Sequence, residues 1–420
     1  MRILFLALDV NVDLNRGDGI HVRELAEKLS IHGHEVRLVA ETHSTSRNWS
    51  ISLSQRPEST VGQVRLASRL ARGWADVIYE RRTSPKVAWS VSLMTGLPFV
   101  IEVNGIVGDE QRSTGGQHAP RDSMIRNAIR ARMMRKASRV IAVSEGIRTT
   151  LISTYGLDAN QVSIVPNGAN TSIFRPLDKS ECRRQLGYSE TERVICYAGN
   201  LVHWQGVQHF LQALVRLTRA KPDVKGLILG EGPDENRLKA MAENLGLSEA
   251  VRFVGAIPYE RVPVFLGAAD VCVAPFEESR KASPIKIFEY LACGKPVVAS
   301  DIDEVGVFLR ETRTGIAVPP SDSAKLEDAI KWILDHPEQL SAMGTRGTEV
   351  VRSTRSWDLT AERVIGLLDS ITTSSRRTGP GGQSGSGSGA NHDSTSCLAD
   401  SPQLKTASIT DRSGMKAPKS

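Results

Sequence analysis

The fold is indicated most clearly by one stretch, Lys281-Ala-Ser-Pro-Ile-Lys-Ile-Phe-Glu-Tyr-Leu-Ala-Cys-Gly-Lys-Pro-Val-Val298, which combines a loop, a short helix and a buried strand. Ser283 is placed to cap this helix and Pro284 to be its first residue, because these residue types favour those positions. Free N–H groups at a helix start attract phosphate, and Lys286 and Glu289 share one helix face. The stretch therefore predicts a site for a diphosphate joined to a ribose. An ordinary capped helix with a surface ion pair would show the same pattern.

On both sides of this stretch, short apolar runs alternate with amphipathic segments, which is typical of parallel sheets covered by helices on both faces. The first series of expected strands is Ile3–Leu8, Glu35–Ala40, Val77–Tyr79, Phe99–Val103, Val140–Val143 and Val162–Val165, with helices such as His21–Ser30 and Ser123–Lys136. The second series is Val194–Tyr197, Gly226–Leu229, Val251–Val254, Val271–Ala274, Pro296–Ala299 and Gly315–Val318. We therefore predict an α/β fold of two doubly wound parallel-sheet domains facing across a cleft, with ligands at the carboxyl ends of the strands.

The expected domains are residues 1–170 and 171–356. The segment Pro166-Asn-Gly-Ala-Asn-Thr-Ser-Ile-Phe-Arg-Pro176 between the two series is rich in turn-forming residues and has no periodicity, as linkers do. Residues 372–420 include the run Gly-Pro-Gly-Gly-Gln-Ser-Gly-Ser-Gly-Ser-Gly-Ala at 379–390 and few apolar side chains. This composition predicts a disordered tail without a catalytic role.

Composition narrows the class of protein. The 420 residues are 40% hydrophobic and 24% charged, as in globular proteins with more than one core. The five cysteines lack metal-ligand spacing and are expected to be reduced. The apolar run Ile3–Leu8 is too short for a signal peptide, and no run approaches a membrane span. We therefore expect a cytoplasmic protein, with the inner face of the membrane as a further location.

The net charge of +6 comes from residues 1–179, and basic residues are densest at 121–139, where they alternate with Met and Ile. Such a basic amphipathic helix is able to rest on an anionic membrane surface. The more ordinary interpretation is a helix whose apolar stripe faces the core. Nucleic acid is not an expected partner, because the chain has no helix-turn-helix or zinc signature.

Taken in order, these features resemble the GT-B-fold retaining glycosyltransferases of family four (glycosyl transferases group 1) over roughly residues 1–372. The resemblance is carried by Gly17-Asp-Gly-Ile-His-Val-Arg-Glu-Leu-Ala26, Gly33-His-Glu-Val36, Val140-Ile-Ala-Val-Ser144, Val165-Pro-Asn-Gly168, Gly230-Glu-Gly-Pro233 and Ser283 to Val298. It implies a hexosyltransferase that moves a sugar from a nucleotide-diphosphate donor, most often UDP-linked, to a hydroxyl of a glycan, lipid-linked or small-molecule acceptor. It implies no other cofactor, and a helix at about 357–371 that crosses back to the first domain.

In the first domain, the resemblance implies that the loop with Gly17 and Gly19 faces the donor phosphates and the acceptor. Many relatives carry a histidine where Asn104 stands, pointing at the sugar. Asparagine forms hydrogen bonds but does not exchange a proton near neutral pH, so Glu102 is the nearest titratable candidate for acid–base work. The alternative is that Gly17–Gly19 and Asn104-Gly105 are ordinary tight turns without a ligand.

In the second domain, relatives commonly have an arginine and a lysine where this chain has Asn200 and Gln205. The cation for the diphosphate is therefore expected to be Lys286, with Lys281 or Arg280 as further candidates. Glu289 is expected to hold the ribose hydroxyls, whereas the family's earlier glutamate would fall at Lys281 and is absent. The remaining expected donor-binding residues are Gly199, Gly230, Glu231, Ser283, Pro284 and Ile285, and Trp204 is placed to pack on a ligand.

The family's mechanism needs no protein nucleophile, since the leaving phosphate is thought to help deprotonate the acceptor on the same face of the sugar. Lys286 and the helix start would then stabilise the leaving group. We expect no metal site, although Asp301-Ile-Asp303 has the spacing of a metal-binding pair. Two alternatives stay open: a nucleotide-sugar epimerase of the same fold, and a degenerate non-catalytic nucleotide-binding protein, for which the uncharged Asn200 and Gln205 argue.

Overall fold

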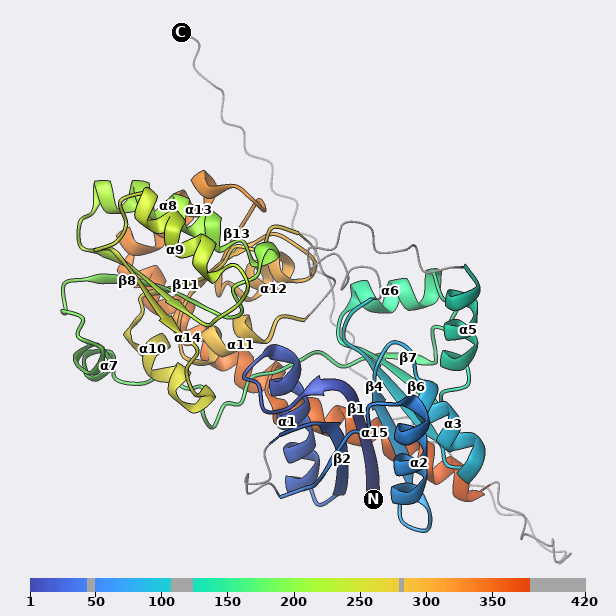
Figure 1. Ribbon diagram of the computed structural model, residues 1–420. Coiled ribbons are helices and arrows are strands. Elements are labelled where there is room, and N and C mark those ends of the chain that lie inside the picture. Colours follow the sequence, from blue (N-terminus) through green and yellow to red (C-terminus); the bar gives the residue numbers. More distant parts are fainter. Residues whose placement is uncertain (44–49, 107–123, 279–282, 378–420) are drawn as a thin grey trace, which may run out of the picture. The chain divides into compact units, whose positions relative to one another are not determined.

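The computed structural model describes residues 1–43, 50–106, 124–278 and 283–377. The described elements form two parallel sheets flanked by helices (Figure 1), which confirms the predicted fold class. We call the parts built on these sheets the first and second domains. The disordered tail was predicted from residue 372, but residues 372–377 continue the last helix, α15 (Trp357–Arg377). The rest of the predicted tail, and the candidate cations Arg280 and Lys281, lie outside the described residues.

The first sheet has seven parallel strands in the order β3-β2-β1-β4-β5-β6-β7. Their bounds are β1 Arg2–Asn11, β2 Glu35–Glu41, β3 Ser52–Gln55, β4 Val77–Arg81, β5 Phe99–Val103, β6 Arg139–Ala142 and β7 Val162–Ile164. The helices between them are α1 Gly17–Ile31, α2 Thr60–Ala71, α3 Lys86–Thr95, α5 Met124–Met134 and α6 Glu145–Ser153. The sequence analysis missed β3, because Ser-Leu-Ser-Gln lacks an apolar run. It forms as an edge strand through pairing with β2, where Leu53 lies opposite Leu38.

The second sheet has six parallel strands in the order β10-β9-β8-β11-β12-β13. Their bounds are β8 Arg193–Ala198, β9 Val224–Leu229, β10 Val251–Gly255, β11 Val271–Ala274, β12 Val297–Ser300 and β13 Gly315–Val318. Its helices are α7 Lys179–Leu186, α8 Val207–Ala220, α9 Glu235–Asn244, α10 Val262–Ala268, α11 Ile285–Ala292, α12 Val305–Thr312, α13 Ser323–Asp335 and α14 Pro337–Thr354, with 3₁₀ turns at His203–Gln205 and Tyr259–Arg261. The strands agree with the predicted series to within two residues at each end.

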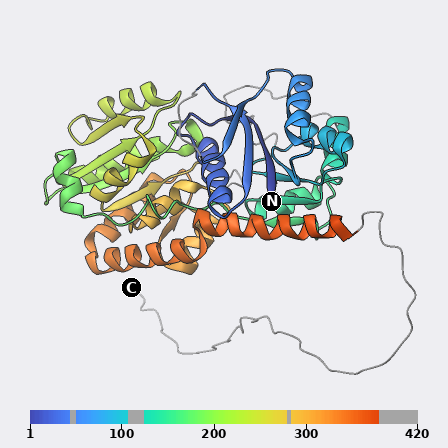
Figure 2. The same ribbon diagram turned by 90° about the horizontal axis from the view of Figure 1, so that it is seen from below.

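The chain passes between the domains twice, and the two passages touch. Ala169 N–H donates to the Arg355 carbonyl at 2.8 Å, and Trp357 N–H donates to the Ala169 carbonyl at 3.1 Å. The last helix, α15 (Trp357–Arg377), then runs alongside the first domain (Figure 2), where Ala361, Val364 and Leu368 join its buried core. Lys28 of α1 pairs with Asp358 of α15 at 2.9 Å.

The basic helix predicted over Ser123–Lys136 forms α5, and its two ends behave differently. Met133 and Met134 are buried at its carboxyl end, whereas Ile125 is 72% exposed and Ile129 52% exposed. The core-facing interpretation thus holds for only part of the helix. None of the described helices has the length and apolar character needed to cross a membrane.

Candidate functional site

A cavity of about 760 Å³ lies where the carboxyl ends of strands from both sheets meet. Twelve of the fourteen residues predicted for the site line it: Gly17, Asn104, Gly199, Asn200, Gln205, Gly230, Glu231, Ser283, Pro284, Ile285, Lys286 and Glu289. The other two, Gly19 and Glu102, lie behind the cavity wall. Residues from the carboxyl ends of parallel strands share one edge of a sheet, which explains why loops distant in sequence converge here.

Lys286 projects from the first turn of α11 into a set of neutral partners. Its Nζ donates to Gln205 Oε1 at 2.6 Å and to the Tyr197 hydroxyl at 3.1 Å, and it lies 4.3 Å from the centre of the Tyr197 ring. Burial lowers the pKa of Lys286 to about 7, although the charge of Glu289 opposes this shift. No carboxylate among the described residues pairs with this amine, so its charge is available to a bound anion.

The side chain of Lys286 packs closely against the loop that carries Gly199. A Cβ on Gly199 would lie 2.3 Å from Lys286 Nζ, and one on Gly230 would lie 2.0 Å from the Gly199 carbonyl oxygen. Gly230 also has a φ of +116°, which side chains rarely adopt. In the first domain, a Cβ on Gly19 would lie 2.6 Å from the Leu14 carbonyl oxygen. For Gly19 this contact accounts for the glycine without a ligand, in agreement with the tight-turn alternative.

The starts of two helices differ from those that the residue types predicted. Helix α11 begins at Ile285 with Pro284 as its N-cap, so Ser283 does not cap it. Ser283 instead accepts two hydrogen bonds from Asn167, at its hydroxyl and at its carbonyl. Helix α1 begins at Gly17, not near His21, and its first turn therefore lies in the cavity wall.

Glu289 lines the same cavity but does not contact Lys286 directly. Its Oε1 accepts a hydrogen bond from the Tyr259 hydroxyl at 2.7 Å. Burial raises the pKa of Glu289 to about 7; the Tyr259 hydrogen bond opposes the shift and the nearby Glu24 adds to it. The two predicted ligand-binding side chains of α11 thus face one cavity with separate partners, whereas their spacing had predicted a neighbouring pair.

Glu102, the predicted acid–base candidate, is buried at the end of β5 and lies behind the cavity wall. Its Oε1 accepts from Asn104 Nδ2 at 2.5 Å and lies 2.6 Å from His21 Nε2, and its Oε2 accepts from the Tyr79 hydroxyl. Burial alone would raise the pKa of Glu102, but His21, Arg81 and the Tyr79 hydroxyl outweigh it and lower the pKa to about 2. A carboxylate with this lowered pKa is ionised and only weakly basic at neutral pH, and Glu102 is not among the residues that line the cavity.

The sequence analysis missed several polar residues of the cavity wall, among them His21 and Asn167. Both line the cavity, and His21 Nδ1 lies 2.8 Å from Asn167 Oδ1. Both were inside quoted motifs, Gly17–Ala26 and Val165–Gly168. The placement of His21 in the first two turns of a helix that starts at the cavity would have identified it, had the helix start been predicted correctly.

Three further residues singled out from the sequence are Trp204, Asp301 and Asp303. Trp204 lines the cavity and stacks on Phe276, with ring centres 6.1 Å apart. Asp301 pairs with Arg310 at 2.6 Å, and Asp303 lines the cavity. Within residues 1–43, 50–106, 124–278 and 283–377, no three His, Cys, Asp or Glu side chains gather as a metal site would require. Chemically, the cavity offers a cation at a helix start for an anion, and a carboxylate for hydroxyls.

Comparison with known proteins gives matches along most of the chain. Residues 178–350 match the family model described as Glycosyl transferases group 1, and residues 16–173 match the one described as Glycosyltransferase Family 4. A D-inositol 3-phosphate glycosyltransferase from Segniliparus rotundus is 28% identical over 298 residues, which cover 70% of this chain and 65% of the relative.

A second relative and a solved structure extend this comparison. A GDP-mannose-dependent monoacylated alpha-(1-6)-phosphatidylinositol monomannoside mannosyltransferase from Corynebacterium glutamicum is 30% identical over 214 residues, or 49% of this chain and 55% of the relative. The structure of Anabaena HepE in complex with UDP-glucose matches with a TM-score of 0.73 and 20% identity, covering 88% of this chain and 100% of that one. At this identity the structural likeness supports the fold.

Proposed function

Because the chain belongs to the glycosyl transferases group 1, with a family 4 glycosyltransferase region in its first half, we propose that it moves a hexose from a nucleotide-diphosphate sugar to an acceptor hydroxyl with retention of configuration. The nucleotide sugar is the co-substrate, and we propose no resident cofactor. The observation that carries this proposal is the position of Lys286 and Glu289, which project from one helix start into a cavity that the first domain closes with Gly17 and Asn104.

Separate groups are proposed to bind the two halves of the donor. The diphosphate is proposed to bind Lys286 Nζ and the free N–H groups at the start of α11, where the helix dipole adds to the positive potential. Gln205 and Tyr197 hold that amine without neutralising it. The uncharged Gln205 is thus proposed to position Lys286, the cation that binds the phosphate, without supplying a charge of its own. The ribose hydroxyls would donate to Glu289.

In this arrangement the protein acts on the leaving group. As the bond between the sugar and the diphosphate breaks, negative charge grows on the phosphate oxygens, and Lys286 together with the helix start stabilises it. The phosphate oxygen on the same face of the sugar accepts the acceptor's proton, so no protein nucleophile is needed. Asn104 lines the cavity as a hydrogen-bonding group and Glu102 orients it from behind.

We propose UDP as the nucleotide and a phosphorylated or lipid-linked acceptor. HepE was solved with UDP-glucose, and the two relatives act on D-inositol 3-phosphate and on an acylated phosphatidylinositol mannoside, as their names state. The second relative uses GDP-mannose, so GDP donors belong in the same test. An acceptor of either kind carries negative charge, which suits the basic first domain.

The test is a screen of UDP-, GDP- and ADP-linked sugars labelled in the sugar, with inositol phosphate, phospholipid and glycan acceptors. Transfer of label to an acceptor, with the anomeric configuration of the donor preserved by NMR, is the expected result. Conversion of the donor without an acceptor would instead indicate an epimerase. Binding without turnover of any donor would indicate the degenerate nucleotide-binding protein.

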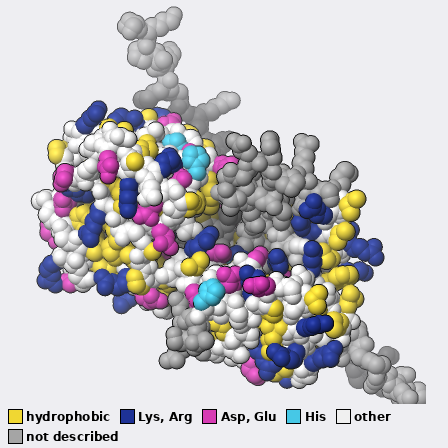
Figure 3. Space-filling view, viewed as in Figure 1, with side chains coloured by type: hydrophobic (Ala, Val, Ile, Leu, Met, Phe, Trp, Pro, Cys, Tyr) yellow, Lys and Arg dark blue, Asp and Glu magenta, His cyan; other side chains and the backbone are white. Residues whose placement is uncertain are grey.

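The exposed side of α5 supports a membrane partner for the first domain. Ile125 and Ile129 are exposed one helical turn apart, and Arg126 and Arg132 are exposed beside them. Apolar and basic side chains also gather on the right-hand edge of the face in Figure 3, the side where Figure 1 labels α3 and α5. Apolar groups flanked by cations match the interface of an anionic bilayer.

Cosedimentation with vesicles tests this partner. The protein should pellet with vesicles of phosphatidylglycerol and phosphatidylcholine but not with phosphatidylcholine alone. The double change Ile125→Ser and Ile129→Ser should weaken this binding by about 30-fold or more, since each buried apolar side chain contributes roughly 1–2 kcal/mol. Ile31→Ser, at an exposed isoleucine on α1, is the matched control. Equal binding to both kinds of vesicle would exclude an anionic membrane partner.

A further inference from the structure

A continuous path of polar contacts joins the core of the first domain to the start of α11 in the second. It runs from Tyr79 through Glu102 to His21, then through Asn167 in the linker to Ser283. Ser283 directly precedes Pro284, the N-cap of α11. The path therefore ends three residues before Lys286, at the backbone that positions the helix start.

Hydrogen-bond roles along this path are determined from the Ser283 end. Asn167 Nδ2 lies 2.7 Å from the Ser283 carbonyl oxygen, and a carbonyl only accepts, so the amide nitrogen must point there. Asn167 Oδ1 consequently faces His21 Nδ1 at 2.8 Å, and that nitrogen must donate. The other ring nitrogen, Nε2, lies 2.6 Å from Glu102 Oε1 without the alignment of a hydrogen bond.

The imidazole of His21 therefore lies between two protein groups, with Nδ1 donating to Asn167 and Nε2 facing the Glu102 carboxylate. Only 2% of the residue is exposed, and the ring packs edge to face on Trp357, with centres 5.1 Å apart and planes at 87°. The neighbouring Ile20 lies in the buried core of the second domain. Packing on Trp357 and the contacts with Asn167 and Glu102 hold the ring in place, so it couples the positions of Glu102 and Asn167.

We propose that His21 and Asn167 are positioning residues that clamp Ser283, and with it the diphosphate-binding start of α11, to the first domain. This inference rests on the proposed function in one respect, namely that a nucleotide diphosphate binds at α11. Both ring nitrogens of His21 face protein groups, Asn167 and Glu102, so His21 acts through Asn167 and not on the reacting atoms. The clamp orders Pro284 to Lys286 before the donor arrives, which lowers the entropy lost on binding.

Asn167→Asp is the sharpest test, because it changes one amide to a carboxylate of the same size. The carboxylate still accepts from His21, but nothing donates to the Ser283 carbonyl and two oxygens now face each other. We expect UDP to bind about tenfold more weakly by calorimetry, as loss of a hydrogen bond next to an unpaired acceptor predicts. Asn160→Asp makes the same chemical change in an exposed loop and should leave UDP affinity unaltered.

Two further measurements separate positioning from a general loss of structure. Uridine lacks the diphosphate, so its weak affinity, measured by saturation-transfer NMR, should be equal in Asn167→Asp and the unchanged protein. In a Lys286→Ala background, Asn167→Asp should add little to the loss of UDP affinity, because both changes act on the same contact. A variant that loses UDP and uridine equally, or whose effect adds fully to that of Lys286→Ala, would overturn the clamp.

The outcome for the unchanged protein distinguishes this inference from the proposed function. If it binds UDP and transfers no sugar, the proposed function falls and the clamp is still judged by the variants. If it binds no UDP, GDP or ADP, both fall together. Unaltered UDP affinity in Asn167→Asp, with transfer intact, would overturn the clamp alone.

Discussion

At the residue scale, Lys286 is the side chain on which donor binding should depend most. Its amine is held by two neutral groups and an aromatic ring, and the described residues offer it no carboxylate partner. Asn200 and Gln205, at the positions where the sequence resemblance leads us to expect cations, are uncharged. Among the cations that line the cavity, Lys286 is the one on the start of α11, whereas Arg16 and Arg81 line it from the first domain.

Lys286→Ala should weaken UDP binding by about 10- to 100-fold, because a charge-assisted hydrogen bond contributes about 1.5–3 kcal/mol. Lys286→Arg keeps the charge and should lose less. Calorimetric titration with UDP measures both. Equal affinity for UDP in the alanine variant and the unchanged protein would show that the diphosphate binds elsewhere.

The pH dependence of donor binding follows from Lys286 and Glu289, the two side chains of α11 whose pKa values are shifted. Lys286 has its pKa lowered to about 7 in the empty site, and a bound diphosphate favours its protonated form, so affinity should fall as pH rises above about 7. Glu289 has its pKa raised to about 7, and ribose hydroxyls favour its ionised form, so affinity should fall as pH drops below about 7. UDP affinity should therefore be greatest near neutral pH.

Two variants test which group causes the decline in UDP affinity at high pH and which causes the decline at low pH. Lys286→Arg, which stays charged throughout, should abolish the decline at high pH, and Glu289→Gln should abolish the decline at low pH. The measurement is the UDP dissociation constant from about pH 5 to about pH 9. A profile that keeps both limbs in both variants would assign the titration to other groups.

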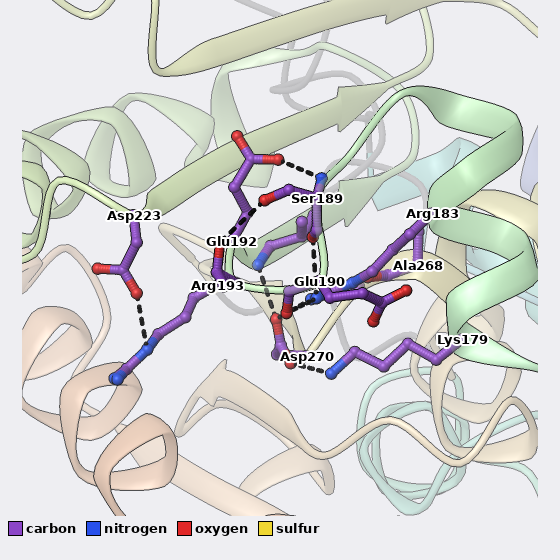
Figure 4. Close-up of polar contacts among 12 residues, drawn as sticks. Lys179, Arg183, Ser189, Glu190, Glu192, Arg193, Asp223, Ala268 and Asp270 are labelled. Atoms are coloured by element: carbon purple, nitrogen blue, oxygen red, sulfur yellow. Dashed lines mark hydrogen bonds and ion pairs between the residues drawn. The ribbon is translucent and has the colours of Figure 1, made fainter.

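At the scale of secondary-structure elements, a charged cluster holds α7 to the second sheet (Figure 4). Asp270, just before β11, pairs with Arg183 of α7 at 2.9 Å and with Lys179, and it accepts from the Val194 N–H of β8 at 2.7 Å. Arg183 is only 2% exposed and also donates to the carbonyls of Ser189, Glu190 and Ala268. A fully paired arginine is thus built into the place where the chain enters the second domain.

Asp270→Asn should destabilise the protein by about 3 kcal/mol, since removing one partner leaves a buried charge uncompensated. Urea unfolding followed by circular dichroism measures the change. Glu181→Gln is the matched control: it removes the partner of Arg184, whose side chain is 78% exposed, and should cost less than about 1 kcal/mol. Similar losses in both variants would show that burial does not set the strength of the Asp270 cluster.

At the scale of the whole molecule, the two passages of chain between the domains depend on a close backbone contact. A Cβ on Gly168 would lie 2.5 Å from the carbonyl carbon of Ser356, directly beside the hydrogen bonds that join Ala169 to the second passage. Backbone atoms on both sides leave no flexible side chain to move away. The glycine is therefore required by packing between segments nearly two hundred residues apart.

Gly168→Ala should lower the free energy of unfolding by about 1–3 kcal/mol, the usual cost of overpacking, and should reduce transfer as the passages separate. Gly366→Ala, in an exposed part of α15 with nothing near its Cβ, should instead stabilise the protein by up to about 1 kcal/mol, because alanine favours helices. Thermal melting compares the two variants directly. Equal melting temperatures for Gly168→Ala and the unchanged protein would contradict the proposed role of this contact.

The sequence pattern was sufficient to predict most strands, because buried parallel strands are continuous apolar runs. It failed for β3, whose pairing with β2 compensates for its polar composition. Helix starts were less predictable: Ser283 has the residue type of an N-cap, yet its hydroxyl and carbonyl are used by Asn167 from the linker. A local propensity was here overruled by a contact between residues more than a hundred positions apart.

The sequence by itself determined the two doubly wound sheets, the family to which the chain belongs and twelve of the residues that line the cavity. Each of these depends on local patterns: apolar runs, glycine-rich loops at strand ends, and a lysine and a glutamate on one helix. Only the tertiary structure decided that Glu102 lies behind the cavity, that Gln205 holds Lys286 and that His21 and Asn167 link the first domain to α11. These are contacts between distant segments, and they exist only after both sheets have formed and their strand ends have met.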